Sequence, residues 1–304
     1  MTKFAAVFPG QGSQAVGMLS DLAQEFDIVE KTYAQASQVL GYDLWKLVQE
    51  GPIEDLNQTQ RTQPALLTAS VAIWRVWESQ GNSAPVVMAG HSLGEYSALV
   101  CAGVIEFTDA VKLVEQRGLF MQEAVPAGVG AMSAIIGLAD DAVEKACQDA
   151  AQDQVCSAVN YNSPGQVVIA GNKEAVARAN ALCKEAGAKR ALLLPVSVPS
   201  HCALMQPAAD KLAQMLQFMS FNTPKIDVIN NVDVTKATQP DEIKNALVRQ
   251  LYCPVRWTES VNLMADEGVE QLLEMGPGKV LTGLTRRINK ALKCVAVNTA
   301  AAVK

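Results

Sequence analysis

Residues 84–100 read APVVMAGHSLGEYSALV: a short apolar run, the pentapeptide GHSLG at residues 90–94, and a segment with helical character. A G-x-S-x-G pattern between a strand and a helix is the sequence form of a nucleophile elbow. The strand must turn sharply into the helix, and the small residues Gly90 and Gly94 permit that turn. Ser92 would then stand at a helix N-terminus, where backbone N–H groups favour negative charge. The alternative is a glycine-rich turn with an inert serine, because a bare motif match also occurs by chance. The strand before the motif and the helix after it favour a nucleophile.

The composition is that of a soluble globular enzyme. The chain has 304 residues, 49% of them hydrophobic and 18% charged, which suffices for one large or two medium domains. A net charge of −6, and no apolar run near the ~20 residues of a membrane span, argue against nucleic-acid and membrane binding. Seven cysteines without a C-x-x-C pair indicate reduced thiols, and two histidines argue against a histidine-rich metal site. The N-terminal apolar segment is too short for a signal peptide. We therefore expect a cytoplasmic protein, and we expect a monomer.

The region before the serine motif is predicted to contain one strand and several helices. Residues 3–8 form a short apolar strand, and the glycines of the polar turn that follows do not have dinucleotide-binding spacing. Ligands bind at the carboxyl ends of parallel strands, so Gln11 in this turn is expected to face the same crevice as Ser92. The alternative is an ordinary strand-to-helix turn. Helices are predicted over residues 17–50, with breaks near Asp27 and Gly41, and from Pro64 to Gly81.

The helix after the serine motif contains an arginine within its apolar face. This helix is predicted to begin with Thr108 as its cap and to run to about Ala124. Arg117 has apolar neighbours three residues away on either side along that face. Such an arginine extends its head group to solvent, finds a buried partner, or faces a cavity that receives an anion. The neighbouring Gly118 removes bulk, which favours the cavity.

Residues 126–198 are predicted to form a small domain inserted into a larger one. A linker at residues 126–130 precedes elements in the order β-α-β-β-α-β, which is the ferredoxin-like order. The strands are residues 132–138, 155–160, 166–170 and 190–196, and the helices are residues 140–151 and 172–186. The larger domain would consist of residues 1–125 and 199–304.

The C-terminal third supplies the remaining elements of the larger domain. Strands are predicted at residues 228–230, 269–274 and 294–298, and helices at residues 241–251 and 280–292. These elements predict an α/β fold. We expect an α/β-hydrolase-like large domain with a parallel sheet and a nucleophile elbow, and a ferredoxin-like small domain.

A serine hydroxyl needs a base, and histidine is the usual base at neutral pH. His91 precedes Ser92 in the turn and is expected to point away from the serine, which leaves His201 at a loop-to-helix junction. The alternative for His201 is a packing role. An acid that completes a triad would be expected between Ser92 and His201 in sequence. The aspartates found there belong to the predicted inserted domain: Asp140, Asp141, Asp149 and Asp153. A backbone carbonyl or amide is therefore a candidate for orienting His201.

Five motifs of this chain together resemble those of the malonyl-CoA:acyl carrier protein transacylases, an acyltransferase family of bacterial fatty-acid synthesis. They are PGQGSQ at residues 9–14, GHSLGE at 90–95, EQR at 115–117, PSH at 199–201 and GPG at 276–278. The resemblance covers nearly the whole chain and thins only in the final residues. It implies an enzyme that takes malonyl-CoA and acyl carrier protein as substrates.

The resemblance implies a two-step cycle. Ser92 would attack the thioester of malonyl-CoA with His201 as its base, which releases CoA and leaves a malonyl-serine ester. The phosphopantetheine thiol of the carrier protein would then take up the malonyl group. The main-chain carbonyl of Gln250 would orient His201, which accounts for the missing acid. No metal or redox cofactor is needed for this chemistry.

The resemblance also implies how the substrate is held. The backbone N–H groups of Gln11 and Leu93 would form the oxyanion hole, and the Arg117 guanidinium would bind the malonyl carboxylate. Gln63 would also line the pocket.

The resemblance also implies an acidic carrier protein as the partner. Because this chain is itself negatively charged, it would need a local basic patch for docking. The candidate residues are Lys189, Arg190, Arg286, Arg287 and Lys290.

Two other interpretations stay open from the residues alone. The serine and histidine equally fit a serine esterase or thioesterase, and a non-catalytic acyl-CoA or carrier-protein binding module would make Ser92 incidental.

Overall fold

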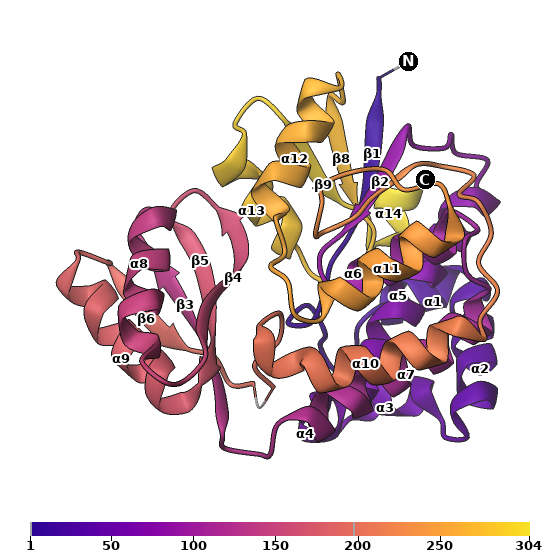
Figure 1. Cartoon of the computed structure of the whole chain (residues 1–304). Coiled ribbons are helices and arrows are strands. Elements are labelled where there is room, and N and C mark those ends of the chain that lie inside the picture. The colour runs from indigo at the N-terminus through magenta and orange to yellow at the C-terminus, as the bar shows by residue number, and fades with distance from the viewer. Residues whose placement is uncertain (1, 197) are drawn as a thin grey trace.

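The computed structural model describes residues 2–196 and 198–304 and contains two β-sheets, each with its own helices (Figure 1). The larger sheet has five parallel strands in the order β7-β2-β1-β8-β9. They are β1 (Phe4–Phe8), β2 (Val87–Gly90), β7 (Val228–Ile229), β8 (Gln271–Glu274) and β9 (Lys293–Ala296). The prediction of an α/β protein with a parallel sheet is confirmed. Residues 1 and 197, which fall within the two predicted domains, lie outside the described part of the chain.

Strand β1 forms the centre of the parallel sheet. Its five residues, FAAVF, are all buried, as expected for a strand that is covered on both faces. Its side chains alternate between two hydrophobic clusters, with Ala6 and Phe8 in one and Ala5 and Val7 in the other. The carboxyl ends of β1, β2 and β8 meet at one edge of the sheet, so the loops that follow these strands converge there.

Helices pack on both faces of the parallel sheet. Those before β2 are α1 (Ser20–Glu25), α2 (Ile28–Leu40), α3 (Leu44–Glu50), α4 (Ile53–Leu56) and α5 (Thr59–Ser79). Those after β2 are α6 (Leu93–Cys101), α7 (Phe107–Ala124), the 3₁₀ turn η1 (Ala203–Met205), α10 (Gln206–Gln217), α11 (Pro240–Gln250), α12 (Trp257–Asp266), α13 (Val280–Ile288) and α14 (Ala300–Val303). The predicted breaks between α1, α2 and α3 are confirmed. Within the described residues, no helix combines the length and the apolar character that crossing a membrane requires.

Two predicted helix starts are wrong, and for the first of them a tertiary contact overrides the local signal. Helix α5 begins before Pro64, which lies inside it, and its first turn is held against α7. At Gly118 of α7 an added Cβ would lie 2.6 Å from the Cα of Gln60, so only glycine allows this approach. Helix α7 likewise begins before the expected cap Thr108, with Glu106 at the N-cap position.

Two predicted C-terminal boundaries are also wrong. Helix α13 does not continue to residue 292, because the Asn289 side chain accepts a hydrogen bond from the backbone N–H of Ala291 at 3.0 Å and favours a turn. The strand predicted to reach Val196 ends three residues earlier. There the N–H of Val196 donates to the carbonyl of Leu194 at 2.8 Å, which is a local turn and not a ladder bond.

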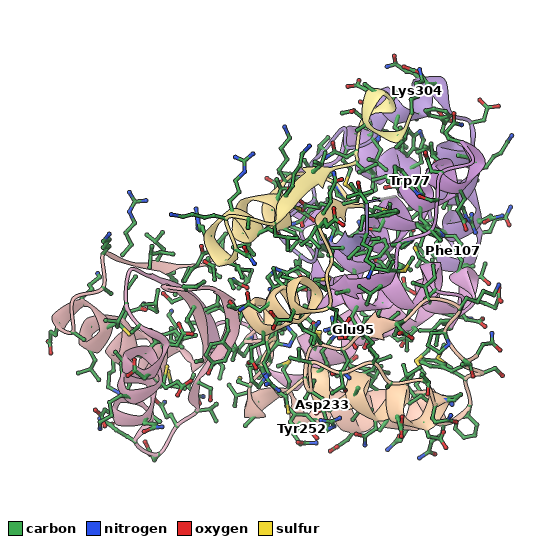
Figure 2. The ribbon with its side chains drawn as sticks, turned by 90° about the horizontal axis from the view of Figure 1, so that it is seen from above. Trp77, Glu95, Phe107, Asp233, Tyr252 and Lys304 are labelled. Atoms are coloured by element: carbon green, nitrogen blue, oxygen red, sulfur yellow. The ribbon has the colours of Figure 1, made fainter. Side chains whose placement is uncertain are left out.

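The smaller sheet has four antiparallel strands in the order β4-β5-β3-β6. They are β3 (Gly130–Ile136), β4 (Cys156–Ser163), β5 (Gln166–Asn172) and β6 (Arg190–Leu193). Helices α8 (Asp140–Ala151) and α9 (Lys173–Glu185) pack on its outer face, away from the parallel sheet (Figure 1). Seen from above, this half lies beside the parallel-sheet half, and the C-terminal Lys304 is at the opposite end of the molecule (Figure 2).

Main-chain contacts join the two halves at the edge strand β4. The N–H of Tyr161 donates to the carbonyl of Val255 at 3.0 Å, and the N–H of Val255 donates to the carbonyl of Val159 at 2.8 Å. The start of β3 also packs closely, because a Cβ at Gly130 would lie 2.5 Å from the ring of Pro199. The smaller sheet is therefore fixed against the segment that carries His201.

A buried carboxylate shapes the turn at residues 276–278. Glu274 at the end of β8 accepts hydrogen bonds from the N–H groups of Leu281 and Thr282 at 2.9 and 2.8 Å, which caps α13. The turn then packs against the loop after β1, since a Cβ at Gly276 would lie 2.3 Å from the ring of Pro9. This contact places residues 9–14 at the sheet edge where β2 ends.

Candidate active site

Ser92 occupies a strained turn between β2 and α6. Its backbone has φ 52° and ψ −110°, a region that residues with a side chain seldom adopt. The flanking glycines allow the turn, because a Cβ at Gly90 would lie 1.9 Å from the backbone of Gly94. Asn231, which follows β7, holds the turn from outside: its Oδ1 accepts from the Ser92 N–H at 2.7 Å, and its Nδ2 donates to the Gly90 carbonyl at 2.6 Å.

His201 contacts the serine directly. Its Nε2 lies 2.8 Å from the Ser92 Oγ, and its Nδ1 lies 2.6 Å from the main-chain oxygen of Gln250. A carbonyl oxygen can only accept, so Nδ1 carries the proton and Nε2 is left to accept from the serine hydroxyl. The backbone of His201 is itself in the left-handed region, with φ 66°, and its N–H donates to the Leu251 carbonyl at 3.0 Å.

The surroundings of His201 keep the ring neutral. Its side chain is 4% exposed, and burial lowers its pKa to about 3, with the nearby Arg117 charge as the second cause. A neutral ring with Nε2 free to accept is the form that can take a proton from Ser92.

Arg117 is buried next to the serine. Its side chain comes from α7 and is 1% exposed, and its Nη2 lies 3.5 Å from the Ser92 Oγ. Nη1 donates to the Gln63 Oε1 at 2.8 Å, Nη2 donates to the Gln250 Oε1 at 2.9 Å, and the Tyr96 ring lies 5.2 Å from the guanidinium carbon. In the described part of the chain its hydrogen bonds thus reach neutral groups and no carboxylate, and its Nε has no partner. Burial lowers the pKa of Arg117 from its ordinary value. A cation so placed favours an anionic ligand.

A cavity of about 120 Å³ joins these groups and lies where the two halves meet. From the parallel-sheet half it is lined by Gln11, Thr59, His91, Ser92, Leu93, Arg117, Met121, Ser200 and His201, from the smaller half by Met132, Asn160, Leu194 and Val196, and from the segment that joins the halves by Val198. Gln11 and Leu93 line this cavity together with Ser92. A Cβ at Gly10 would lie 2.5 Å from the His91 carbonyl, so the loop after β1 is pressed against the serine turn.

Two predicted side chains have different surroundings from those expected. Gln63 is fully buried and does not line the cavity; it lies behind Arg117 and accepts that residue's hydrogen bond. His91 lines the cavity, but its Nε2 lies 2.7 Å from the Asn162 Oδ1 and its ring lies 5.6 Å from that of Trp257.

The predicted docking residues lie away from the cavity lining. Lys189 and Arg190 stand at the start of β6, and Arg286 with Lys290 lines a separate groove at the end of α13. Two further lysines, Lys279 and Lys293, line the same groove. Arg287 has a partner in the smaller sheet, the side-chain oxygen of Gln166.

Sequence reasoning missed three polar residues at the site. Asn231 follows β7, which is the strand beside β2, so its place at the carboxyl end of a parallel strand was the available signal. Glu95 lies three residues after Ser92 in α6 and is 2% exposed. Asn160 of β4 lines the cavity with a buried Oδ1 that has no partner among the described residues. Glu95 belongs to the GHSLGE motif at residues 90–95, but its contacts could not be read from that motif, and Asn160 has no sequence signal of its own.

The family of the chain follows from comparison with known proteins. Residues 6–302 match the acyl transferase domain model, and the chain therefore belongs to the acyl transferase domain family.

Within that family the chain is similar to malonyl CoA-acyl carrier protein transacylases, which confirms the resemblance seen in the motifs. It is 68% identical to that of Escherichia coli strain K12 over 303 residues, covering 100% of this chain and 98% of the relative. It is 44% identical to that of Bacillus subtilis over 299 residues, covering 98% and 94%.

Solved structures share the whole fold. An acyl carrier protein S-malonyltransferase from Vibrio cholerae superposes with a TM-score of 0.98 at 70% identity, covering 99% of both chains. A malonyl-transacylase in complex with a type II PKS acyl-carrier protein superposes with a TM-score of 0.99 at 64% identity, covering 99% of this chain and 98% of that one.

Proposed function

We propose that this chain moves a malonyl group from malonyl-CoA to the phosphopantetheine thiol of acyl carrier protein, through a malonyl ester of Ser92, and so feeds fatty-acid synthesis. The observation that carries the proposal is the buried Arg117, whose Nη2 lies 3.5 Å from the Oγ of a serine that is paired with a neutral histidine. A hydroxyl paired with a base supports acyl transfer in general. A cation beside it supports an acyl group that carries its own carboxylate.

The fold supports two finer assignments. The strained serine between a parallel strand and a helix is consistent with a nucleophile elbow in an α/β-hydrolase-like domain of residues 1–125 and 199–304. The strand order β4-β5-β3-β6, with α8 and α9 on one face, is consistent with a ferredoxin-like domain of residues 126–198.

In the first half-reaction, the Oγ of Ser92 attacks the thioester carbon while Nε2 of His201 takes the hydroxyl proton. The negative charge moves to the carbonyl oxygen, where the N–H groups of Gln11 and Leu93 would stabilise it. Leu93 is the first residue of α6, so its N–H has no acceptor within the helix. The carbon–sulfur bond then breaks, and the proton on His201 passes to the CoA sulfur.

In the second half-reaction, the carrier-protein thiol gives its proton to His201 and its sulfur attacks the malonyl-serine ester. The bond to Oγ breaks, and the proton returns from His201 to Ser92. The Gln250 carbonyl keeps the ring in one tautomer through both steps, because it can only accept from Nδ1.

The malonyl carboxylate would also tune the base. Arg117 is one cause of the low pKa of His201 in the free enzyme, since two positive charges in one buried site repel. A carboxylate bound to Arg117 offsets that charge and raises the pKa of His201 from about 3, which makes it a stronger base once malonyl is present. We infer that this cycle needs no metal or redox cofactor, because the chain's own residues supply nucleophile, base and anion binding.

The carrier protein is proposed to dock through the cationic side chains of Arg286 and Lys290, which share one groove, and of Lys189, Arg190 and Arg287. The solved complex of a 64% identical malonyl-transacylase with an acyl-carrier protein supports this class of partner. We further infer a cytoplasmic monomer.

The proposal is tested by incubating the chain with malonyl-CoA and phosphopantetheinylated acyl carrier protein and measuring the mass of the carrier protein. Malonylated carrier protein is the expected product. Free malonate without carrier modification would identify a thioesterase, and an unchanged malonyl-CoA pool would identify a binding module.

A further inference from the structure

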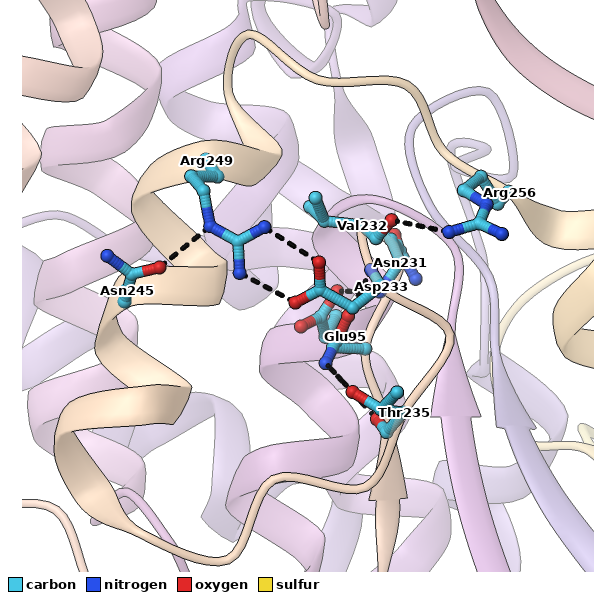
Figure 3. A network of polar contacts seen from close by, with 9 residues as sticks. Glu95, Asn231, Val232, Asp233, Thr235, Asn245, Arg249 and Arg256 are labelled. Carbon is cyan, nitrogen blue, oxygen red and sulfur yellow. Dashed lines mark hydrogen bonds and ion pairs between the residues drawn. The ribbon is translucent and has the colours of Figure 1, made fainter.

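A buried carboxylate lies close to the serine turn, on the helix that the turn begins. Glu95 of α6 is 2% exposed, and its Oε2 accepts from the backbone N–H of Asn231 at 3.0 Å and from the Nε2 of Gln250 at 2.8 Å. Figure 3 shows Glu95 beneath the loop that follows β7, and Figure 2 shows Glu95 and Asp233 in the parallel-sheet half. The mechanism above does not use this group.

Glu95 makes the shortest of the contacts that set which way the Gln250 amide faces. A carboxylate oxygen without a proton can only accept, so the amide must turn its NH₂ group toward Glu95. The same Nε2 also donates to the Ser92 carbonyl at 3.1 Å. The amide oxygen is thereby left to face Arg117, and it accepts from Nη2 at 2.9 Å. A reversed amide would instead point its NH₂ group at the guanidinium and lose that bond.

The same carboxylate oxygen reaches the serine turn by a second route. It fixes the backbone of Asn231, whose side chain holds the Ser92 N–H and the Gly90 carbonyl. On its outer side the loop is held by an ion pair, in which Arg249 donates to both oxygens of Asp233 at 2.8 and 2.6 Å (Figure 3). The loop is thus held on its buried side by the Glu95 carboxylate, through the backbone of Asn231, and on its outer side by the ion pair between Asp233 and Arg249.

Glu95 also acts on Arg117 as a nearby negative charge, although among the described residues the guanidinium makes no direct hydrogen bond to a carboxylate. The titratable groups that face Glu95 are Arg117 from α7, Tyr96 from α6 and Asp233 from the loop after β7. Burial raises the pKa of Glu95 to about 7, and Arg117 opposes that rise. Its charge therefore changes within the ordinary working range of pH.

We propose that Glu95 is a positioning residue for acyl selectivity: through the Gln250 amide it holds the Arg117 guanidinium in the orientation that receives the malonyl carboxylate. This inference rests on the proposed function, since it concerns the same site. Loss of the negative charge at Glu95 weakens one of the contacts that hold the amide NH₂ group, beside those to the Ser92 carbonyl and the Asn231 Oδ1 at 3.1 and 3.5 Å. The amide and the Arg117 guanidinium bound to it are then held less firmly, while Ser92 and His201 stay in contact.

The test is the ratio of kcat/KM for malonyl-CoA to kcat/KM for acetyl-CoA in Glu95→Gln. Both substrates use Ser92 and His201, so a general loss of activity cancels in the ratio, which reports what the malonyl carboxylate adds through Arg117. We expect the ratio to fall by about tenfold, as loss of one hydrogen bond to a charged group implies. The matched control is Asp233→Asn, which removes the outer carboxylate of the same loop and should leave the ratio within about twofold of wild type.

A second readout needs no variant. As pH falls from 8 to 6, Glu95 takes up a proton, so the malonyl-to-acetyl ratio of the wild-type chain should fall by about fivefold. In Glu95→Gln the ratio should not change over the same range. A structural role alone would lower stability without making selectivity depend on pH.

The outcomes separate this inference from the proposed function. A wild-type chain without any preference for malonyl-CoA would contradict the proposed function itself. A wild-type preference that survives in folded Glu95→Gln within about twofold would overturn the positioning role. If Glu95→Gln does not fold, Glu95→Asp takes its place, because its shorter side chain withdraws the carboxylate from the Gln250 amide, and a preference within about twofold of wild type would then overturn the positioning role.

Discussion

The Nδ1 of His201 lies 2.6 Å from the main-chain oxygen of Gln250, so a carbonyl holds the position that an acid fills in a Ser-His-Asp triad. The carbonyl fixes the tautomer but brings no negative charge. Burial and the Arg117 charge both oppose protonation, so the pKa of the His201 ring falls to about 3. His201 is therefore uncharged in the free enzyme at neutral pH.

This arrangement predicts how stability depends on pH. The unfolded chain protonates His201 near pH 6.5 and the folded chain only near 3, so the unfolded state binds more protons between these values. Stability must therefore fall as pH drops below 6.5. Between pH 7.5 and 5 the wild-type chain should lose about 2 kcal/mol more unfolding free energy than His201→Gln, as measured by urea denaturation. His91 is present in both chains, so its contribution cancels. Equal losses would show that the folded protein carries a charged or exposed His201.

Gly94 should be essential to the fold of the serine turn. A Cβ at this position would lie 2.0 Å from the Phe8 carbonyl oxygen in the central strand, and neither backbone can give way cheaply. Gly94→Ala should cost about 3 kcal/mol or more of unfolding free energy, or prevent folding. The control is Gly283→Ala in α13, where an added Cβ meets no atom within 4 Å and alanine should stabilise the helix by up to about 1 kcal/mol. A tolerated Gly94→Ala would mean that the strand and the turn are packed less closely than described.

Carrier-protein docking should depend on the groove at the end of α13. Changing both Arg286 and Lys290 to glutamate should raise the KM for the carrier protein by about tenfold at low salt. The KM of this variant should also depend less on salt concentration than that of the wild-type chain. Acylation by malonyl-CoA should persist. We leave Arg287 unchanged because it contacts Gln166 of the smaller sheet, so its reversal would disturb that contact as well.

The matched control reverses Lys31 and Lys46, which are exposed on α2 and α3 and change the net charge equally. Equal damage in the control, or equal loss of both half-reactions in the Arg286 and Lys290 variant, would argue against docking at this groove.

Arg117 should set the preference for a carboxylated acyl group. Its guanidinium offers two parallel donors that match a carboxylate, which the ammonium of lysine cannot reproduce. Arg117→Ala should reduce kcat/KM for malonyl-CoA by at least ~100-fold, while that for acetyl-CoA holds steady or rises. Arg117→Lys should fall between, nearer to alanine. An unchanged malonyl-to-acetyl ratio in Arg117→Ala would place the carboxylate contact elsewhere.

Much of this arrangement could be predicted from the sequence because it depends on local patterns. The strand, turn and helix around Ser92 follow from an apolar run and two glycines, and the parallel sheet follows from alternating strands and helices. His201 could be inferred because few histidines compete for the role. Its carbonyl partner came only as an implication of the family resemblance, since any residue's backbone can supply a carbonyl.

What could not be predicted depends on contacts between distant segments. The start of α5 is set by its packing against Gly118 and not by Pro64. Asn231 lies 139 positions from Ser92 in sequence and holds its N–H. The role of Gln63 as a support behind Arg117, where a pocket wall was expected, follows from side-chain packing that no spacing reveals.

The central claim is that Ser92 carries the malonyl group between the two half-reactions. The most direct measurement is the intact mass of the chain after brief incubation with malonyl-CoA in the absence of carrier protein, for the wild-type chain and for Ser92→Ala. We predict one malonyl group per wild-type chain, lost on addition of phosphopantetheinylated carrier protein, and none on a folded Ser92→Ala. A malonyl adduct on Ser92→Ala, or transfer to the carrier protein by that variant at the wild-type rate, would contradict the account.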